Sequence, residues 1–215
     1  GNQSFKDLHR LIVTSAVYRQ SSANHPKFAA RDAANRFLWR MNRRRLDAES
    51  IRDAVLQVAN RLDLKMYGPG FRPFGFKNDH SPQYRYAEHD PNDLRTQRRS
   101  VYRFLVRSVP DPFMETLDCA DPSMVVEKRN ETITPLQALA LLNNKFMVVM
   151  SGHFANDIER RTTKPADQIR LAMMTTMGRA PSQGELNVLK KYRQKHGLSN
   201  TCRLMLNLNE FVFVD

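Results

Sequence analysis

The sequence predicts a mainly α-helical domain with a small β-ribbon and one long loop rich in aromatic residues, glycine and proline. Apolar residues recur at helical spacing in several segments, and most of these segments begin with a residue that can cap a helix. Residues 65–93 show no helical period. At 215 residues, 41% hydrophobic and 26% charged, the chain can bury a core. We therefore expect a single helical domain over residues 1–215, with an irregular insertion at about 65–93.

The first helix is expected to begin at Ser4, with Asp7 at the capping-box position. The sequence "SSANHP" then ends the helical pattern, because polar residues followed by proline do not readily continue a helix. The apolar residues of this segment share one face: Phe5, Leu8, Leu11, Ile12 and Ala16.

The clearest helical pattern lies within residues 35–63. Asp47 is the expected N-cap, and Leu46 and Ile51 occupy the two positions of a hydrophobic staple. The predicted buried stripe consists of Ile51, Val55, Val58 and Leu62. Ion pairs are expected on the exposed or intermediate face among Arg45, Glu49, Arg52 and Asp53.

The irregular insertion contains aromatic residues that argue against full disorder, and a loop of this length inside a domain is usually functional or disordered. After it, "RRSVYRFLVRS", residues 98–108, alternates with the period of a strand. We expect this strand to pair with "GFRPFGF", residues 70–76, as a small ribbon. A short helix is expected after Pro112.

Helix signals return in "KRNETITPLQALALLNN", residues 128–144. Thr134 and Gln137 form a predicted capping box, and Pro135 suits the first helical position. An apolar stripe continues from there: Leu136, Leu139, Leu142, Phe146, Val149 and Met150. Most of this motif is therefore explained by helix initiation.

The last third of the sequence contains further helix boundaries. Pro165 opens a helix that Gly178 is expected to end. Ser182 and Glu185 predict another capping box, and Gly197 is expected to end that helix. Ser199 can cap a final helix, and the apolar, β-prone end "NEFVFVD" is expected to be held to the body of the domain.

The charge balance is basic, with 34 Lys and Arg against 22 Asp and Glu, a formal charge of +12. This excess would attract polyanions such as nucleic acid, anionic lipid or a sulfated or carboxylated polysaccharide. The alternative, which we favour, is a basic surface that has no specific partner or is neutralised by an acidic neighbouring domain. Nucleic acid is the least favoured partner, because no reader motif appears and the charges are spread over the chain.

The cysteine and motif content narrows the possible chemistry. Cys119 and Cys202 either form one disulfide or stay free, and their spacing does not decide between these states. Neither CxxC nor CxxCH occurs, so no haem cofactor is expected in this chain. No apolar run approaches a membrane span, and no signal peptide is visible. Standard hydrolase, zinc-protease and nucleotide-binding motifs do not occur either, so no catalytic residue is predicted.

The insertion contains possible metal ligands, but no metal site is predicted there. Five possible ligands lie in the insertion: His80, Glu88, His89, Asp90 and Asp93. Their spacing matches no standard motif, so a solvated polar loop is the favoured interpretation.

Arginine provides the stronger candidate site. Guanidinium groups suit bidentate capture of carboxylate, sulfate or phosphate. The predicted ligand-binding set is Arg98, Arg99, Arg129, Glu131, Gln137 and Asn143. The alternative is internal pairing of arginines with acidic residues in the same segments (Glu49, Asp53, Asp118 or Glu131), and we favour it, because arginine suits buried ion pairs.

Six blocks, taken in order, carry a resemblance over nearly the whole chain. They are "LHRLIVTSAVYRQSS", "NRFLWRMNRRRLDAESIRDAVL", "RRSVYRFLVRS", "RNETITPLQALALLNN", "GRAPSQGE" and "LNLNEFVFVD". Together they resemble the planctomycete domain of unknown function 1553, also called the planctomycete-specific PSD domain. Matching positions include Trp39, Arg45, Leu46, Glu49, Arg52, Asp53, Arg98, Arg99, Ser100, Tyr102, Arg129, Thr132, Gln137, Asn143, Asn209, Glu210 and Phe211.

The resemblance implies a C-terminal fragment of a large bacterial protein exported to the periplasm or the exterior. Such proteins commonly carry another uncharacterised domain and sometimes a cytochrome-c-like domain, to which any haem would belong. Relatives often have a cysteine shortly before the "RNET" block, where this chain has Val126. No thiol role is therefore expected at that position, and the nearest cysteine is Cys119.

These observations favour a non-catalytic C-terminal module of an exported multidomain protein. Its expected partners are other domains of the same polypeptide, or an acidic polysaccharide held by the clustered arginines. The alternative is a redox or hydrolytic domain that works beside a haem-bearing domain and uses residues 65–93 in its site.

Overall fold

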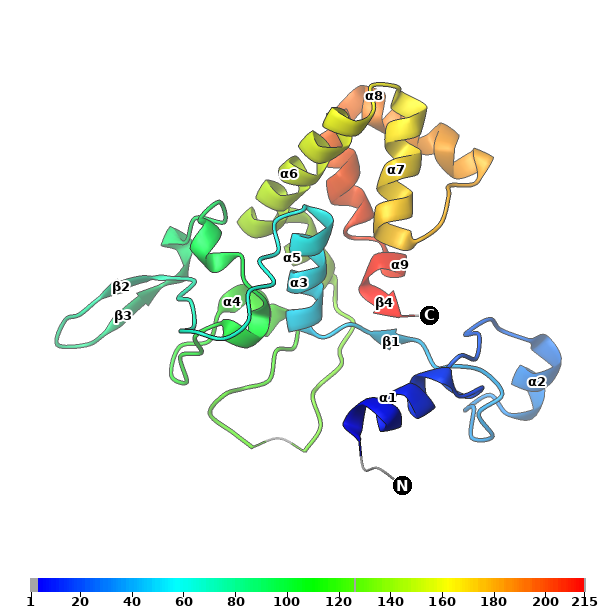
Figure 1. Ribbon diagram of the computed structural model, residues 1–215, viewed down its shortest axis with the longest axis horizontal. Helices are drawn as coiled ribbons and strands as arrows, with labels where there is room; N and C mark the ends of the chain where they lie inside the picture. The colour runs from blue at the N-terminus through cyan, green and yellow to red at the C-terminus, as the bar shows by residue number, and fades with distance from the viewer. Residues whose placement is uncertain (1–3, 126, 215) are drawn as a thin grey trace. The chain divides into compact units, whose positions relative to one another are not determined.

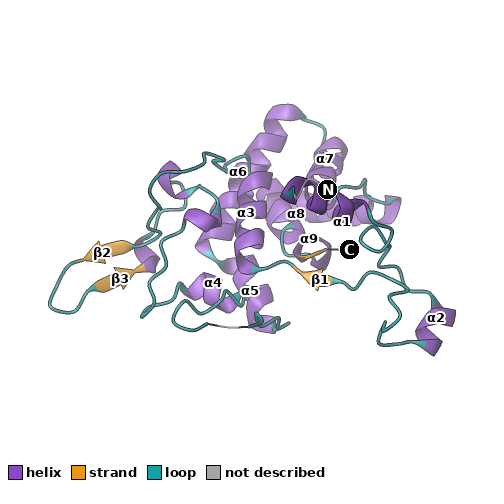
Figure 2. Ribbon diagram, turned by 60° about the horizontal axis from the view of Figure 1, so that its bottom comes forward, coloured by secondary structure: helices purple, strands orange, loops and turns teal. Residues whose placement is uncertain are grey.

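The computed structural model describes residues 4–125 and 127–214, so the predictions for Val126 and Asp215 fall outside the described residues. The chain divides into two compact units, residues 46–212 and residues 1–45 together with 213–215. The predicted fold class is confirmed, because helices are the main regular structure of the described residues and the described strands form two small antiparallel sheets (Figures 1 and 2).

The unit of residues 46–212 contains most of the helices. They are α3 (Ala48–Val58), α4 (Pro112–Thr116), α5 (Pro135–Asn143), α6 (Lys145–Arg161), α7 (Pro165–Met177), α8 (Gln183–Met205) and α9 (Asn209–Val212). Short 3₁₀ turns cover Tyr86–Glu88, Leu94–Thr96 and Ser100–Tyr102, and the ribbon strands are β2 (Gly75–Lys77) and β3 (Gln83–Arg85).

The core of this unit lies among α3, α6, α7 and α8. The long helix α6 packs against α8, and α7 packs against both (Figure 1). The side chains of Ile51, Met150, Phe154, Ile169 and Met205 are almost completely buried. Burial of each such side chain stabilises the fold by about 1.5–3 kcal/mol.

Local capping signals in this unit behave as predicted. The carboxylate of Asp47 accepts from the backbone N–H of Ser50 at 2.7 Å and caps α3. The capping boxes of Thr134 at α5 and of Ser182 at α8 are both present. Gly178 ends α7 in the left-handed conformation, with φ of 70°. These motifs span only three or four residues, so local sequence is enough to specify them.

The predicted strand at residues 98–108 is wrong. Its contact with Phe71 is a single bridge, in which Phe71 N–H donates to the Tyr102 carbonyl at 2.9 Å. The physical reason is a tie to α3. Asp53 accepts from both the N–H and the hydroxyl of Ser100, at 2.9 and 2.7 Å, and this holds the segment against the helix.

A ribbon does form, but within the insertion, where β2 and β3 pair antiparallel with Phe76 opposite Tyr84. Phe74 packs edge-on against Tyr84 and Tyr86, with ring centroids 5.3 Å apart in each pair. The insertion is therefore ordered by its aromatic residues, and Figure 2 shows the ribbon extending from the helices of its unit.

Gly197 interrupts α8, as the sequence indicates, although a helical segment resumes at once. Its φ of 81° and ψ of 167° are non-helical, so α8 consists of two helical segments joined by a kink. The second segment buries Leu198, Cys202 and Met205.

The other unit contains α1 (Phe5–Thr14), α2 (Pro26–Arg31), β1 (Arg44–Arg45) and β4 (Phe213–Val214), with β1 and β4 paired antiparallel. The capping box predicted for Ser4 is wrong, because its side chain makes no capping hydrogen bond. The apolar face of α1 buries no residue. Between residues 4 and 45, the buried residues are Ser22 and Asn35, so this segment has no apolar core of its own.

The two cysteines do not form a disulfide. Cys119 and Cys202 are both free, and Cys202 is buried in the core. Over the described ranges, no helix has the length and apolar character that a membrane span requires.

Candidate functional site

A buried arginine on α3 organises the centre of the larger unit. Arg52 is only 7% exposed. Its guanidinium donates to the carbonyls of Thr96 (2.6 Å) and Arg98 (3.0 Å) and to the hydroxyl of Ser100 (3.2 Å). It also pairs with Asp53 at 3.2 Å. One side chain on α3 therefore holds a segment more than forty residues away in sequence.

Burial lowers the pKa of Arg52 to about 10, although the neighbouring carboxylate of Asp53 acts in the opposite direction. The group therefore stays charged at neutral pH. The rings of Phe71 and Phe146 lie 5.0 and 5.7 Å from its central carbon, which adds cation–π attraction. Removal of such a buried charged group, with its partners left in place, typically lowers the free energy of unfolding by about 3–5 kcal/mol.

Arg98 and Arg99, two residues of the predicted set, lie on the segment that Arg52 holds. Arg98 donates to the carbonyls of Pro69 (2.6 Å), Tyr67 (2.7 Å) and Lys65 (3.2 Å). Its guanidinium also stacks on the ring of Tyr102, 3.9 Å from the centroid. Arg99 lies farther from the same ring, at 5.8 Å. The donors of Arg98 therefore fix the start of the insertion.

Arg129, a third predicted residue, reaches the first turn of α3. It makes a bidentate pair with Glu49, at 2.7 and 3.2 Å, and lies 3.6 Å from Asp47. This pair joins the loop before α5 to α3. The contacts of Arg129 with Asp47 and Glu49 and those of Arg98 with Lys65, Tyr67 and Pro69 share no residue, so they do not bring the two arginines into one site.

The other members of the predicted set surround the start of α5. The side-chain amide of Gln137 donates to Asp118 (3.0 Å) and Thr132 (2.9 Å) while its oxygen completes the capping box. Glu131 is exposed beside Thr132, and Asn143 is exposed at the end of α5. Ligand binding by the six predicted residues stays a prediction.

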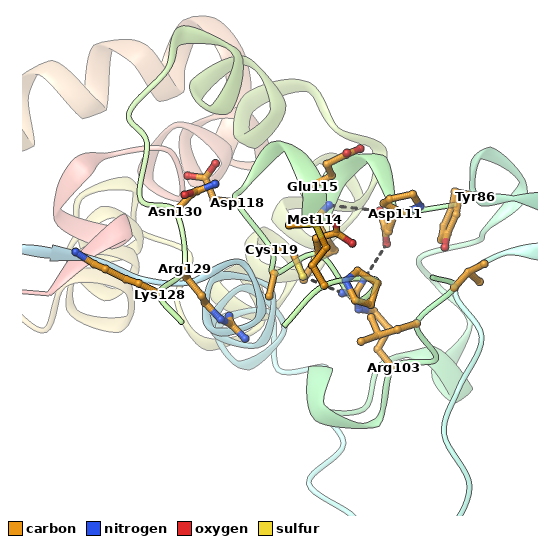
Figure 3. A pocket seen from close by; sticks show the side chains of 17 residues that line it. Tyr86, Arg103, Asp111, Met114, Glu115, Asp118, Cys119, Lys128, Arg129 and Asn130 are labelled. Atoms are coloured by element: carbon orange, nitrogen blue, oxygen red, sulfur yellow. Dashed lines mark hydrogen bonds and ion pairs between the residues drawn. The ribbon is translucent and has the colours of Figure 1, made fainter. Parts of the chain in front are cut away.

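Sequence reasoning missed a second buried arginine with an unusual neighbour. Arg103 donates to Asp111 at 3.2 Å and to the sulfur of Cys119 at 3.4 Å. The thiol in turn donates to Glu49 at 3.5 Å. In Figure 3, Cys119 lies between Arg103 and Arg129. Sequence offered no signal for this group, because its members come from four separate segments.

A cavity of about 350 Å³ opens beside this group (Figure 3). Its lining mixes charged residues with apolar ones: Arg103, Asp111, Glu115, Lys128 and Arg129 with Leu105, Val106, Met114 and Met124. Desolvation and the Glu49 carboxylate raise the pKa of Cys119. The thiol is therefore protonated at neutral pH and is a weak nucleophile.

A second cavity, of about 420 Å³, shares Tyr86, Asp111 and Met114 with the first and is also lined by Arg52 and His89. Burial and the charge of Arg52 lower the pKa of His89. Its Nε2 lies 2.9 Å from the hydroxyl of Thr96. His89 is thus favoured in its neutral form.

The five possible metal ligands of the insertion do not converge. His89 contacts Thr96, Glu88 pairs with Arg85, and Asp93 pairs with Arg95. His80 is exposed. Among the described residues, no group of three or more His, Cys, Asp or Glu side chains is placed to hold a metal ion.

One of three comparisons with known proteins found a match. No curated protein and no solved structure matches the chain. The model of one family, PSD1, described as a protein of unknown function (DUF1553), matches residues 1–193. This match covers most of the 215 residues, and the chain therefore belongs to the DUF1553 family.

Proposed function

We propose that the chain is a non-catalytic module that docks onto neighbouring domains of the same exported polypeptide. The observation that carries the proposal is the use of its arginines. Arg52, Arg98, Arg103 and Arg129 direct their guanidinium donors at internal carbonyls, carboxylates and a thiol. Donors used in this way stabilise one compact arrangement and leave little capacity for a charged ligand at these positions.

The surface offered for docking lies on α5 and the residues before it. Ile133, Leu136 and Leu139 are 80%, 62% and 55% exposed. Leu136 and Leu139 are three residues apart on one helix and therefore point to the same side. The opposite side of α5 is packed, with Gln137 and Leu141 buried. Adjacent exposed leucines of this kind mark interaction surfaces more often than isolated ones do.

Hydrogen–deuterium exchange tests this proposal. The complete polypeptide and the chain alone are labelled in parallel, and residues 133–140 should exchange more slowly in the complete polypeptide. The double variant Leu136→Ser, Leu139→Ser should remove that protection. The matched control is Val188→Ser, which changes a 66% exposed apolar residue on α8.

Equal exchange of residues 133–140 in both samples would refute docking through this surface. Loss of protection in the control as well as in the double variant would instead indicate a general effect of removing exposed apolar groups.

The catalytic alternative has one feature in its favour, the cavity beside Cys119. The raised pKa of this thiol weighs against a nucleophilic role, and the described residues of the insertion do not gather a metal-binding group. We therefore prefer docking over catalysis.

A further inference from the structure

One row of basic and amide side chains on α8 has no role in the contacts described so far. Asn187, Lys190, Lys191 and Gln194 are spaced i, i+3, i+4 and i+7, so they share one face of the helix. All four are exposed. With Arg193 and Pro165 they line an open groove of about 460 Å³ between the first segment of α8 and the start of α7.

Three cations of this groove, Lys190, Lys191 and Arg193, lie within four consecutive residues of α8. Among the described residues, no carboxylate pairs with Lys190, Lys191 or Arg193. The Nε of Arg193 is shielded from solvent and, within the same ranges, has no hydrogen-bond partner. The Nε atoms of Arg61, Arg98, Arg103 and Arg203 are in the same state, so the groove is distinguished by the clustering of its cations and not by this atom.

Two acidic side chains, one on α6 and one in the first turn of α7, already pair with arginines. Asp157 pairs with Arg160 and Arg161, at 3.0 and 2.7 Å. Asp167 pairs with Arg170 at 2.8 Å. These two carboxylates therefore do not neutralise the cations of the groove, and the exposed lysines present their positive charge to solvent.

The start of α8 shows the same pattern. Arg179 binds both Glu185 and Glu210, which lowers the pKa of Glu185 to about 2 and keeps this carboxylate ionised within that cluster. Glu185 therefore compensates Arg179, while the groove cations one to two turns farther along α8 keep their charge.

The chemistry of the lining indicates the class of ligand. Clustered cations attract sulfate, carboxylate or phosphate groups. The side-chain amides of Asn187 and Gln194 can donate to and accept from hydroxyl groups. None of the described residues that line the groove is aromatic. Single-stranded nucleic acids bind largely by stacking on aromatic rings, so this lining suits a saccharide chain better.

We infer that the groove formed by Asn187, Lys190, Lys191, Arg193 and Gln194 binds a sulfated or carboxylated polysaccharide. This site is separate from the α5 surface, so the inference does not depend on the docking proposal. It also differs from the arginine set predicted from the sequence, whose donors are largely used internally.

Binding to a fluorescent heparin oligosaccharide, measured at several salt concentrations, tests the inference. The variant Lys190→Gln, Lys191→Gln, Arg193→Gln should bind about tenfold more weakly or worse, because three charge contacts are lost. The matched control, Arg160→Gln, Arg161→Gln, Arg170→Gln, removes the same number of charges from cations that already have carboxylate partners. The control should keep affinity within about threefold.

Wild-type affinity should fall as salt rises, and neutral dextran should not bind. Circular dichroism of each variant establishes that it is folded. An equal loss of affinity in both triple variants would overturn the inference, since it would show attraction by net charge alone. Stronger binding of a DNA oligonucleotide than of the heparin oligosaccharide, abolished by the groove variant, would reassign the groove to nucleic acid and also overturn it.

Discussion

At the scale of single residues, arginine dominates the structure, but its role depends on tertiary placement. The sequence identified Arg98 and Arg129 as positions of interest. The favoured alternative named Glu49 among the possible internal partners, and Arg129 does pair with it. The sequence did not indicate which arginine would do so, or that Arg98 donates to three backbone carbonyls. A guanidinium donates to any oxygen acceptor that the fold brings near, so the sequence predicts that an arginine can donate several hydrogen bonds but leaves its partner open. The contact between Arg103 and Cys119 was missed for the same reason.

His89 makes stability depend on pH. The hydroxyl of Thr96 donates to the Asp93 carbonyl at 2.8 Å and so accepts from Nε2 of His89. Because burial lowers the pKa of His89 in the folded state, the unfolded state binds the proton more tightly. Stability from this group is therefore complete above the unfolded pKa of about 6.5 and is lost as pH falls through the folded value.

We expect the free energy of unfolding, measured with urea, to decrease between pH 7.5 and 5.5. The decrease should be smaller in His89→Gln. His153 is the control position, because burial lowers its pKa as well. The variant His153→Gln should still show the part of the decrease in unfolding free energy that His89 causes. Identical pH dependence in wild type and His89→Gln would show that His89 does not contribute.

At the scale of elements, prediction succeeded where the signal is local. The caps at Asp47, Thr134 and Ser182 need only residues three apart, and all three form. It failed at residues 98–108, where alternation of apolar residues suggested a strand. There the bonds from Ser100 to Asp53, 47 residues away, determine the conformation, and a local pattern cannot report such a contact.

The two glycines of α8 give a matched pair of substitutions. Gly197, with φ of 81° and ψ of 167°, is in a conformation that is nearly restricted to glycine. Gly197→Ala should therefore destabilise the protein by about 1–3 kcal/mol. Gly184 is helical, and a methyl group there would have no atom within 4 Å. Gly184→Ala should stabilise by about 0.5–1 kcal/mol. Thermal unfolding measures both, and equal shifts in Tm would contradict the assigned kink.

At the scale of the molecule, the distribution of buried apolar residues separates the two units. Every buried apolar residue of the described ranges lies between residues 46 and 212. The helical class and the basic charge followed from composition and periodicity. The restriction of the core to one unit could not be predicted in this way, because α1 has a good amphipathic pattern and still buries no residue. Periodicity shows that a face can be buried, whereas a partner surface decides whether it is.

This distribution predicts that residues 46–212 fold without the remainder of the chain. A fragment of residues 46–212 should unfold in one cooperative thermal transition, because it contains the helices α3 and α6–α8 with their shared core. A peptide of residues 4–45 should show little helix by circular dichroism, since isolated helices of about ten residues are marginal in water. A non-cooperative transition in the larger fragment would mean that its core needs the other unit. A well-folded peptide would mean that hydrogen bonds such as that from the Trp39 indole to the Asp32 carbonyl stabilise the smaller unit without an apolar core.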